Sequence, residues 1–198
     1  GGYFLYAGRL IADKGLQIIR EIAEHRPNLR FIICGEGNPE PWLGPANLFY
    51  FPPVKGRGRN ALYGGATAML CPSQYCEPFG LVAIEAMATG TPVIAADNGG
   101  FCETVYHGQT GFRCLTLGDW LSAVDCLANR KQQPIDLERQ TALLADYAKD
   151  YYGMPRVGHL LDCIFRQVKS LDGKGWYECE PFNAVLAQSI YFGSIYLH

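Results

Sequence analysis

Four charged side chains lie where they could bind one anionic sugar compound. Arg9 and Lys14 come just after the apolar run at 3–8, and Glu77 and Glu85 lie on either side of the start of a second apolar stretch. Cations beside a helix N-terminus can hold a diphosphate and stabilise the charge that develops when it leaves. Carboxylates accept hydrogen bonds from the hydroxyls of a sugar. Together, these residue types point to a compound that carries both groups, such as a nucleotide sugar.

The stretch CEPFGLVAIEAMATGTPVIAAD at 76–97 predicts a helix that begins near Phe79 or Gly80. Its free amides would face a phosphate, and Gly80 has no side chain to keep a phosphate away. Glu77 precedes the helix, and Glu85 lies inside it without another charge nearby in the sequence, where an unpaired carboxylate costs free energy. Sugar hydroxyls would satisfy it. The alternative is that Glu77 is a surface residue and that Glu85 is paired within the protein.

Short apolar runs with helical stretches between them must position these side chains. The runs lie at 3–8, 30–35, 47–52, 68–73 and 92–97. Most are apolar on both faces, which is typical of parallel strands covered by helices on both sides. We therefore expect an α/β fold with a doubly wound, Rossmann-like parallel sheet. In such sheets ligands bind at the carboxyl ends of the strands, which is where Arg9 and Lys14 would lie, unless they are simply solvated.

After residue 114 the sequence becomes helical. Helices are expected at roughly 117–129, 135–147 and 156–170. We predict a nucleotide-sugar-binding domain over 1–170 and an apolar tail over 171–198, which either packs on this domain or docks on a partner domain. The apolar stretch from 79 to 96 is interrupted by Glu85, Gly90 and Pro92, which favours a helix followed by a buried strand over a transmembrane segment.

Composition excludes several classes of protein. The chain of 198 residues is 48% hydrophobic and 18% charged, with a formal charge of -2 and no basic block, so it offers nothing for nucleic acid or an anionic membrane. The eight cysteines occur singly without a CxxC pair, and no signal peptide is evident, which favours a reducing cytoplasm. The four histidines lack metal-like spacing, so no metal site is expected.

Several phrases occur in the order and spacing of a known family. They are YAGRLIADKG, FIICGEG, CPSQYCEPFGLVAIEAMATGTPVIAAD, NGGFCETV and HGQTGF. The sequence resembles the retaining glycosyltransferases of the large family-four group, strongly over residues 3–114 and weakly to about 170. The most specific feature is Glu77, seven intervening residues and then Glu85.

The resemblance implies the C-terminal, donor-binding half of a GT-B fold. It implies that Arg9 and Lys14, after Gly8, hold the donor diphosphate and that Glu77 lies near the transferred sugar. These three charged residues are the predicted catalytic residues. Phe79, Gly80 and Leu81 match the backbone segment that approaches sugar and phosphate, and Glu85 matches the carboxylate that holds the ribose hydroxyls.

The same resemblance implies no metal and no cofactor, because protein cations replace the metal ion. The donor would be a UDP- or GDP-sugar. An N-terminal domain of similar size would have to bind the acceptor, either as part of a longer protein or as another chain.

Two other functions are weighed against this one. The chain could be a non-catalytic nucleotide-sugar-binding or interaction module. A dinucleotide-dependent oxidoreductase is disfavoured, because GEGNPE at 35–40 and AGRLIAD at 7–13 both lack the complete glycine fingerprint.

Smaller candidates remain open. Glu36 follows the second strand and either contacts the donor or shapes a turn. KGRGRN at 55–60 is expected as a loop, in which Arg57 and Arg59 are solvated or approach the base or phosphates. NGG at 98–100 follows the fifth strand, where the glycines permit a turn into the next helix.

Overall fold

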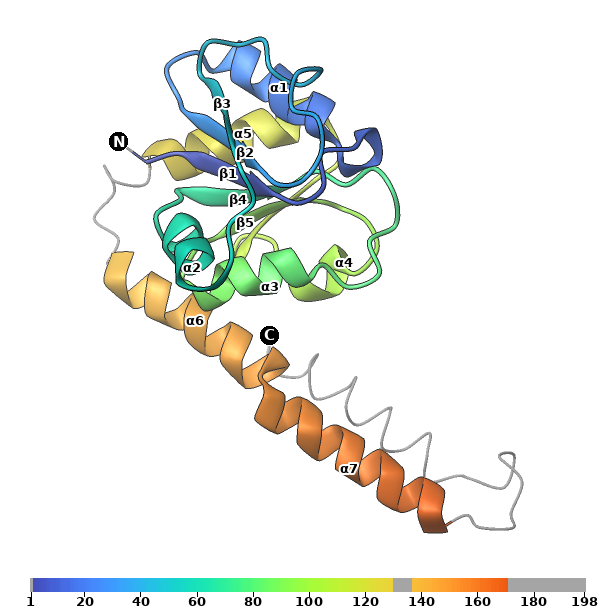
Figure 1. Ribbon diagram of the computed structural model, residues 1–198. Coiled ribbons are helices and arrows are strands. Elements are labelled where there is room, and N and C mark those ends of the chain that lie inside the picture. Colours follow the sequence, from blue (N-terminus) through green and yellow to red (C-terminus); the bar gives the residue numbers. More distant parts are fainter. Residues whose placement is uncertain (1, 130–136, 171–198) are drawn as a thin grey trace. The chain divides into compact units, whose positions relative to one another are not determined.

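Six short strands form one parallel sheet in the computed structural model, which describes residues 2–129 and 137–170 (Figure 1). The strands are β1 (Phe4–Ala7), β2 (Phe31–Cys34), β3 (Leu48–Phe51), β4 (Ala68–Cys71), β5 (Val93–Ala96) and β6 (Gly111–Cys114). Their order across the sheet is β3-β2-β1-β4-β5-β6, and every neighbouring pair is parallel. The predicted doubly wound α/β sheet is confirmed.

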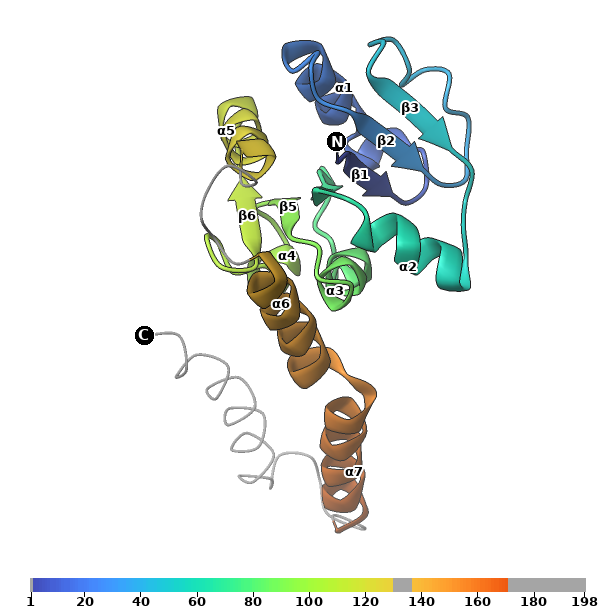
Figure 2. The same cartoon turned by 90° about the vertical axis from the view of Figure 1, so that its left-hand side faces the viewer.

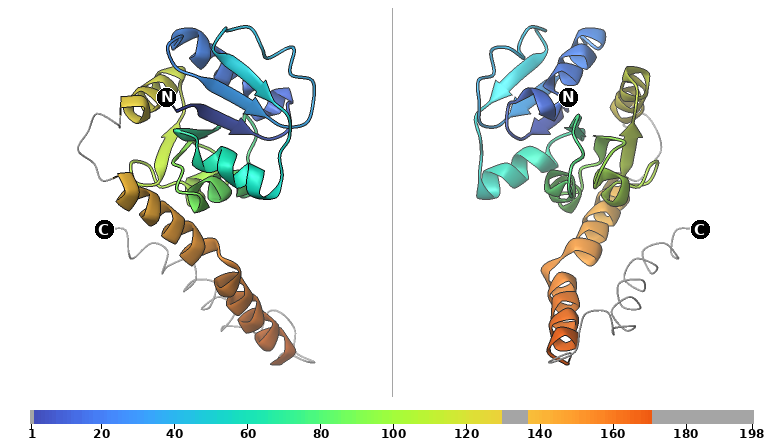
Figure 3. Two further views of the ribbon diagram at one scale, coloured as in Figure 1. Left: turned by 60° about the vertical axis from the view of Figure 1, so that its left-hand side comes forward. Right: turned by 90° about the vertical axis from the view of Figure 1, so that its right-hand side faces the viewer.

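Helices cover both faces of this sheet. One face carries α1 (Leu16–His25) and α5 (Leu117–Ala128), and the other carries α2 (Gly56–Gly64), α3 (Leu81–Ala88) and α4 (Phe101–Thr104) (Figures 2 and 3). The 3-10 turn η1 (Ala12–Lys14) precedes α1. The helices α6 (Leu137–Tyr152) and α7 (Met154–Ser170) follow in the chain.

Apolar residues on both faces of the central strands make the core. Phe4 of β1 stacks on Phe31 of β2 with ring centroids 5.4 Å apart, and both rings are buried. The apolar face of α1 is buried through Leu16, Ile19 and Ile22. Burying each such side chain contributes on the order of 1.5–3 kcal/mol. The sheet edge that carries the charged residues therefore rests on a rigid base.

Two elements differ from the sequence-based expectation. Residues 55–60 were expected as a loop, but Gly56–Gly64 is the helix α2, with Tyr63 buried against the sheet. Residues 110–114 were not assigned as a strand, yet Gly111–Cys114 is the edge strand β6, paired with β5. In both cases tertiary packing decides the structure where local preference is weak.

The chain divides into two compact units, one through Asp150 and one from Tyr151. The first unit holds the sheet with α1 to α5 and most of α6, and α7 belongs to the second. The boundary predicted from the sequence lies later, after residue 170, and the predicted apolar tail at 171–198 lies outside the described residues. Over 2–129 and 137–170, no helix has both the length and the apolar character needed to cross a bilayer.

Candidate functional site

The candidate site lies where the strand order reverses. β1 pairs with β2 on one side and with β4 on the other, so the connections that leave β1 and β4 diverge across the sheet. In doubly wound sheets this divergence opens a crevice at the carboxyl ends of the strands. Gly8 and Arg9 follow β1, and the segment that leads to Glu77 follows β4.

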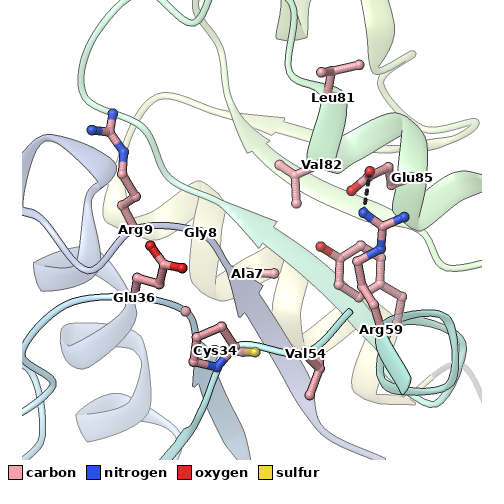
Figure 4. Close-up of a pocket in the computed structure, with 13 residues that line it drawn as sticks. Ala7, Gly8, Arg9, Cys34, Glu36, Val54, Arg59, Leu81, Val82 and Glu85 are labelled. Atoms are coloured by element: carbon pink, nitrogen blue, oxygen red, sulfur yellow. Dashed lines mark hydrogen bonds and ion pairs between the residues drawn. The ribbon is translucent and has the colours of Figure 1, made fainter. Parts of the chain in front are cut away.

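A cavity of about 380 Å³ occupies this edge (Figure 4). It is lined by Ala7, Gly8, Arg9, Cys34, Gly35, Glu36, Pro53, Val54, Arg59, Tyr63, Leu81, Val82 and Glu85. Four of the predicted site residues are therefore brought together, namely Gly8, Arg9, Leu81 and Glu85. The other four, Lys14, Glu77, Phe79 and Gly80, do not line the cavity.

Arg9 lies at one end of the cavity, and Glu85 lies at the other (Figure 4). The Arg9 side chain is exposed, and within 2–129 and 137–170 it has no hydrogen-bond or ion-pair partner. Its backbone is fixed, because the Tyr6 hydroxyl donates to the Arg9 carbonyl oxygen at 2.6 Å. A free guanidinium on an anchored backbone is suited to bind an anion that enters the cavity.

The N-terminus of α3, whose residues Leu81 and Val82 line the cavity, has backbone amides that no side chain caps. Leu81 is its first residue, Gly80 is the N-cap, and no side chain caps the helix. The first amides of a helix lack intrahelical acceptors and attract anions. Gly80 has φ 82°, and a Cβ there would lie 2.5 Å from the buried ring of Phe101. This position thus requires glycine because of its left-handed backbone and its packing, in addition to the predicted access to the amides.

Lys14 and Glu77 form an ion pair at the same edge of the sheet. Lys14 Nζ donates to Glu77 Oε2 at 2.8 Å, and both side chains are largely buried, at 18% and 16% exposure. Lys14 also hydrogen-bonds to the Tyr75 hydroxyl and lies over the Tyr75 ring, 4.6 Å from its centroid. The Ser73 hydroxyl donates to Glu77 Oε2 at 3.3 Å. Two of the three predicted catalytic residues therefore contact each other.

Electrostatics keep this pair ionised. Burial opposes the charge on Glu77, but hydrogen bonds from Lys14, Tyr75 and Ser73 outweigh it and hold the pKa of Glu77 below its usual value. Burial also opposes the charge on Lys14, and the same two partners, Glu77 and Tyr75, raise the pKa of Lys14 nevertheless. Burial is the main cause that raises the pKa of Tyr6; the negative charge of Glu77 adds to the rise, and the positive charge of Arg9 opposes it.

Glu85 is paired within the protein. Arg59 Nη1 of α2 donates to Glu85 Oε1 at 2.7 Å, and the side chains are 40% and 37% exposed. This is the alternative that the sequence left open for Glu85, although its carboxylate also lines the cavity. Arg59 was expected in a loop, and it belongs instead to a helix at the cavity wall. Arg57 is exposed and does not line the cavity.

The glycines at 98–100 support the loop that carries Glu77. The amide of Gly100 donates to the Glu77 carbonyl oxygen at 2.6 Å. Gly99 has φ 52°, and a Cβ there would lie 2.4 Å from the same oxygen. These residues therefore do more than permit a turn, because they let the two loops pack backbone to backbone. Glu36 lines the cavity near Arg9, as one of its two predicted roles requires (Figure 4).

Sequence reasoning did not identify Tyr75, Ser73 or Tyr6 as parts of the site. Tyr75 and Ser73 hydrogen-bond the ion pair from the segment between β4 and Glu77. The signal available was their place within a few residues of Glu77, at the carboxyl end of a buried strand. Tyr6 follows the buried residues Phe4 and Leu5 within an apolar strand, so its sequence position carries no signal of a site.

The described part of the chain holds no group of three or more histidine, cysteine or acidic side chains that could bind a metal ion. Cys34 lines the cavity, and burial raises its pKa. Cys71 at the end of β4 is buried, and burial raises its pKa as well. A buried thiol with a raised pKa is a poor nucleophile, so these two cysteines have structural roles.

Comparison with known proteins gives a consistent result. Residues 2–127 match the family model described as glycosyl transferases group 1. The chain is 34% identical over 163 residues to a D-inositol 3-phosphate glycosyltransferase of Pseudarthrobacter chlorophenolicus, covering 72% of this chain and 38% of the relative. It is 36% identical over 122 residues to a glycogen synthase of Mycobacterium tuberculosis, covering 56% and 29%. The chain thus spans about a third of the length of these curated relatives.

Solved structures share the fold. The sucrose-phosphate synthase of Thermosynechococcus elongatus superposes with a TM-score of 0.73 at 23% identity, covering 85% of this chain and 46% of that one. The Anabaena protein HepE, solved in complex with UDP and glucose, gives a TM-score of 0.66 at 19% identity, covering 82% and 48%. Identities this low support the sheet architecture and do not assign a substrate.

Proposed function

Because the chain belongs to the glycosyl transferases group 1 family, we propose that it is the donor-binding half of a retaining glycosyltransferase. It would bind a nucleotide-diphosphate sugar and take part in transferring the sugar to an acceptor hydroxyl. UDP and GDP are the proposed nucleotides, and the HepE structure, which shares the fold, was solved with UDP and glucose. The cytoplasm is the proposed compartment, because the cysteines occur singly along the sequence and suggest a reducing environment.

One observation carries this proposal, namely the order of charges along the cavity. Arg9 lies at one end of the cavity and the Glu85 carboxylate lies at the other, and α3 begins with its uncapped amides at Leu81, one turn before Glu85. A nucleoside diphosphate has the same order of groups, with an anionic diphosphate next to a ribose that donates two hydroxyl hydrogen bonds. The diphosphate would bind at Arg9 and α3, and the ribose would bind at Glu85.

The transferred sugar would then extend toward the Lys14–Glu77 pair. Lys14 would stabilise the negative charge on the departing diphosphate together with Arg9. Glu77, whose pKa is held low, would accept hydrogen bonds from the sugar as an ionised carboxylate. Retention would follow if the acceptor attacks from the face that the diphosphate leaves, since no carboxylate is proposed as a covalent nucleophile.

The acceptor would be bound by an N-terminal domain, in cis or in trans. The greater length of the curated relatives supports this part of the proposal, because the chain covers 38% and 29% of the two described above. Protein cations would neutralise the diphosphate in place of a metal ion. Transfer should therefore proceed in the presence of EDTA.

Titration calorimetry with UDP, GDP and ADP tests the proposal. We expect saturable heat with one of the three, and at least about tenfold weaker binding after Arg9→Ala, the loss typical of a hydrogen bond to a charged group. The matched control is Arg30→Ala. Arg30 is an exposed arginine just before β2, at the amino ends of the strands and away from the cavity. If no nucleotide gives heat, the chain is an interaction module and the donor site is wrong.

A further inference from the structure

We infer that Arg59 is a positioning residue that orients Glu85 toward the ribose of the donor. The inference rests on the proposed function, because it concerns the same cavity. It assigns a role to a side chain outside the glutamate motif and on a different helix. Arg59 comes from α2, and Glu85 comes from α3.

The contact between them is short and lies in the cavity wall. Arg59 Nη1 is 2.7 Å from Glu85 Oε1, across 26 residues of sequence (Figure 4). Both residues line the cavity. A charge-assisted hydrogen bond of this length restricts the rotamers of the carboxylate, which would otherwise be free at 37% exposure.

Stability does not explain the pair. Ion pairs between side chains this exposed contribute little to folding, because water and salt screen them. The Arg59 Nε atom is also buried without a hydrogen-bond partner in the described part of the chain, which costs free energy. A guanidinium with a buried, unpaired donor and an exposed carboxylate partner is better explained by a role in binding.

With Arg59 bonded to Oε1, the Glu85 carboxylate keeps hydrogen-bond acceptor positions for the two hydroxyls of a ribose. An ionised carboxylate accepts several hydrogen bonds on its two oxygens. Arg59 uses one position on Oε1, so Oε2 and the remaining position on Oε1 are open to the two adjacent ribose hydroxyls. Arg59 is itself held over the Tyr63 ring, with its Cζ 5.9 Å from the ring centroid. Preference for ribose over deoxyribose should therefore depend on Arg59.

The test compares a ribonucleotide with its 2′-deoxy form by calorimetry on the full chain. With UDP and 2′-deoxy-UDP, or the GDP pair if GDP is the ligand, the unaltered chain should prefer the ribonucleotide about tenfold or more. Arg59→Met keeps the length and apolar part of the side chain and should bring this ratio close to one. Arg57→Met, an exposed arginine on the same helix outside the cavity, should keep the full ratio.

The possible outcomes separate this inference from the proposed function. No nucleotide binding by the unaltered chain overturns the proposed function, and the role of Arg59 with it. Binding without preference for ribose, or an undiminished preference in Arg59→Met, overturns the role of Arg59 alone. If Arg59→Met does not unfold cooperatively, Arg59→Lys decides. Lysine keeps the positive charge but lacks the planar guanidinium, so the preference for the ribonucleotide over its 2′-deoxy form must fall in this variant.

Discussion

Lys14 and Glu77 depend on each other for their ionised state. Glu77 has a lowered folded-state pKa, so the stability that it contributes is present above its unfolded pKa and is lost as the pH falls through the folded value. Lys14 has a raised folded-state pKa, so its contribution is present below its unfolded pKa and is lost as the pH rises through the folded value. The pair is therefore most stabilising between these two limits, in the neutral range.

Replacing Lys14 with Met should raise the pKa of Glu77. Burial of Glu77 remains in this variant, while its hydrogen bond and charge partner is lost, and Tyr75 and Ser73 compensate only in part. Carbon NMR titration of the side-chain carboxyls measures this change directly. The stability that Glu77 loses on acidification should then be smaller than in the unaltered chain, because its folded and unfolded pKa values lie closer together.

Lys149→Met is the control for this prediction, because Lys149 is exposed on α6. It removes the same charge from the chain and should leave the Glu77 titration where it is. An unchanged Glu77 pKa in Lys14→Met would show that Tyr75 and Ser73 suffice to hold the carboxylate ionised, contrary to the expectation.

Among the helices, α5 has the best-defined N-terminus. The Thr116 hydroxyl accepts from the Asp119 amide at 3.2 Å, and the Asp119 carboxylate accepts from the Thr116 amide at 2.8 Å, which completes a capping box. Thr116→Ala should lower the free energy of unfolding by about 1 kcal/mol. For a chain of this size that corresponds to a fall of roughly 2–4 °C in Tm.

Ser122→Ala is the matched control on the same helix. The Ser122 hydroxyl only donates back to the Gly118 carbonyl oxygen, at 2.8 Å on the exposed face. Such a bond adds little to helix stability, so the Tm should change by less than in Thr116→Ala. Equal losses in the two variants would contradict the importance of the capping box.

The N-terminus of α3 should tolerate no side chain at its cap. Gly80→Ala would place an alanine at φ 82°, which costs roughly 1–2 kcal/mol before any clash. Its Cβ would also press on the buried Phe101 ring. Thermal unfolding should show the loss, and nucleotide affinity should fall because the first amides of α3 move.

Gly118→Ala provides the comparison for Gly80→Ala. Gly118 lies inside α5, where an added Cβ would be 3.6 Å from Thr116 Oγ1, an ordinary contact. Alanine favours the helix there, so Tm should stay the same or rise. A Gly80→Ala variant as stable as Gly118→Ala would rule out the strained cap.

The elements that the sequence predicted well are those with a strong local signature. Each of β1 to β5 falls within a short apolar run, which is typical of parallel strands, although the edge strand β3 leaves Phe49, Tyr50 and Phe51 exposed. β6 lacks this signature because Arg113 lies within its four residues. α2 contains several glycines and buries only Tyr63, so no apolar stripe reveals it.

The site was predicted less completely for a similar reason. The ends of β1 and α3 follow from their own sequence, and thus Arg9, Leu81 and Glu85 were expected at one edge. The partner of Glu85 is 26 residues away on a helix that the sequence does not reveal, and only tertiary structure brings Arg59 to it. Local patterns place a residue on an element, whereas contacts between elements depend on the whole fold.

At the scale of the whole molecule, the unit through Asp150 is self-sufficient in its core and its cavity. All residues that line the cavity lie before residue 86, and α6 contributes the buried Leu144 and Ala148. A chain that ends at Tyr152, the last residue of α6, should therefore unfold cooperatively.

Nucleotide affinity of this shortened chain should equal that of the full chain, measured by calorimetry. Chemical denaturation followed by circular dichroism checks that the shortened chain folds. Loss of binding in a shortened chain that still folds would mean that residues after Tyr152 contribute to the donor site.

The residues that line the cavity come from the carboxyl ends of the three strands β1, β2 and β3 and from the two helices α2 and α3. Apart from the Arg59–Glu85 contact, which joins two of these walls, a substitution in one wall should alter one recognition element and leave the geometry of the others in place. Such a layout suits divergence by point mutation: variants at Pro53 and Val54, which line the cavity after β3, should change the preference for the base and keep the affinity for the diphosphate. The specificity for the donor nucleotide could thus be engineered by changing one strand-to-helix segment at a time.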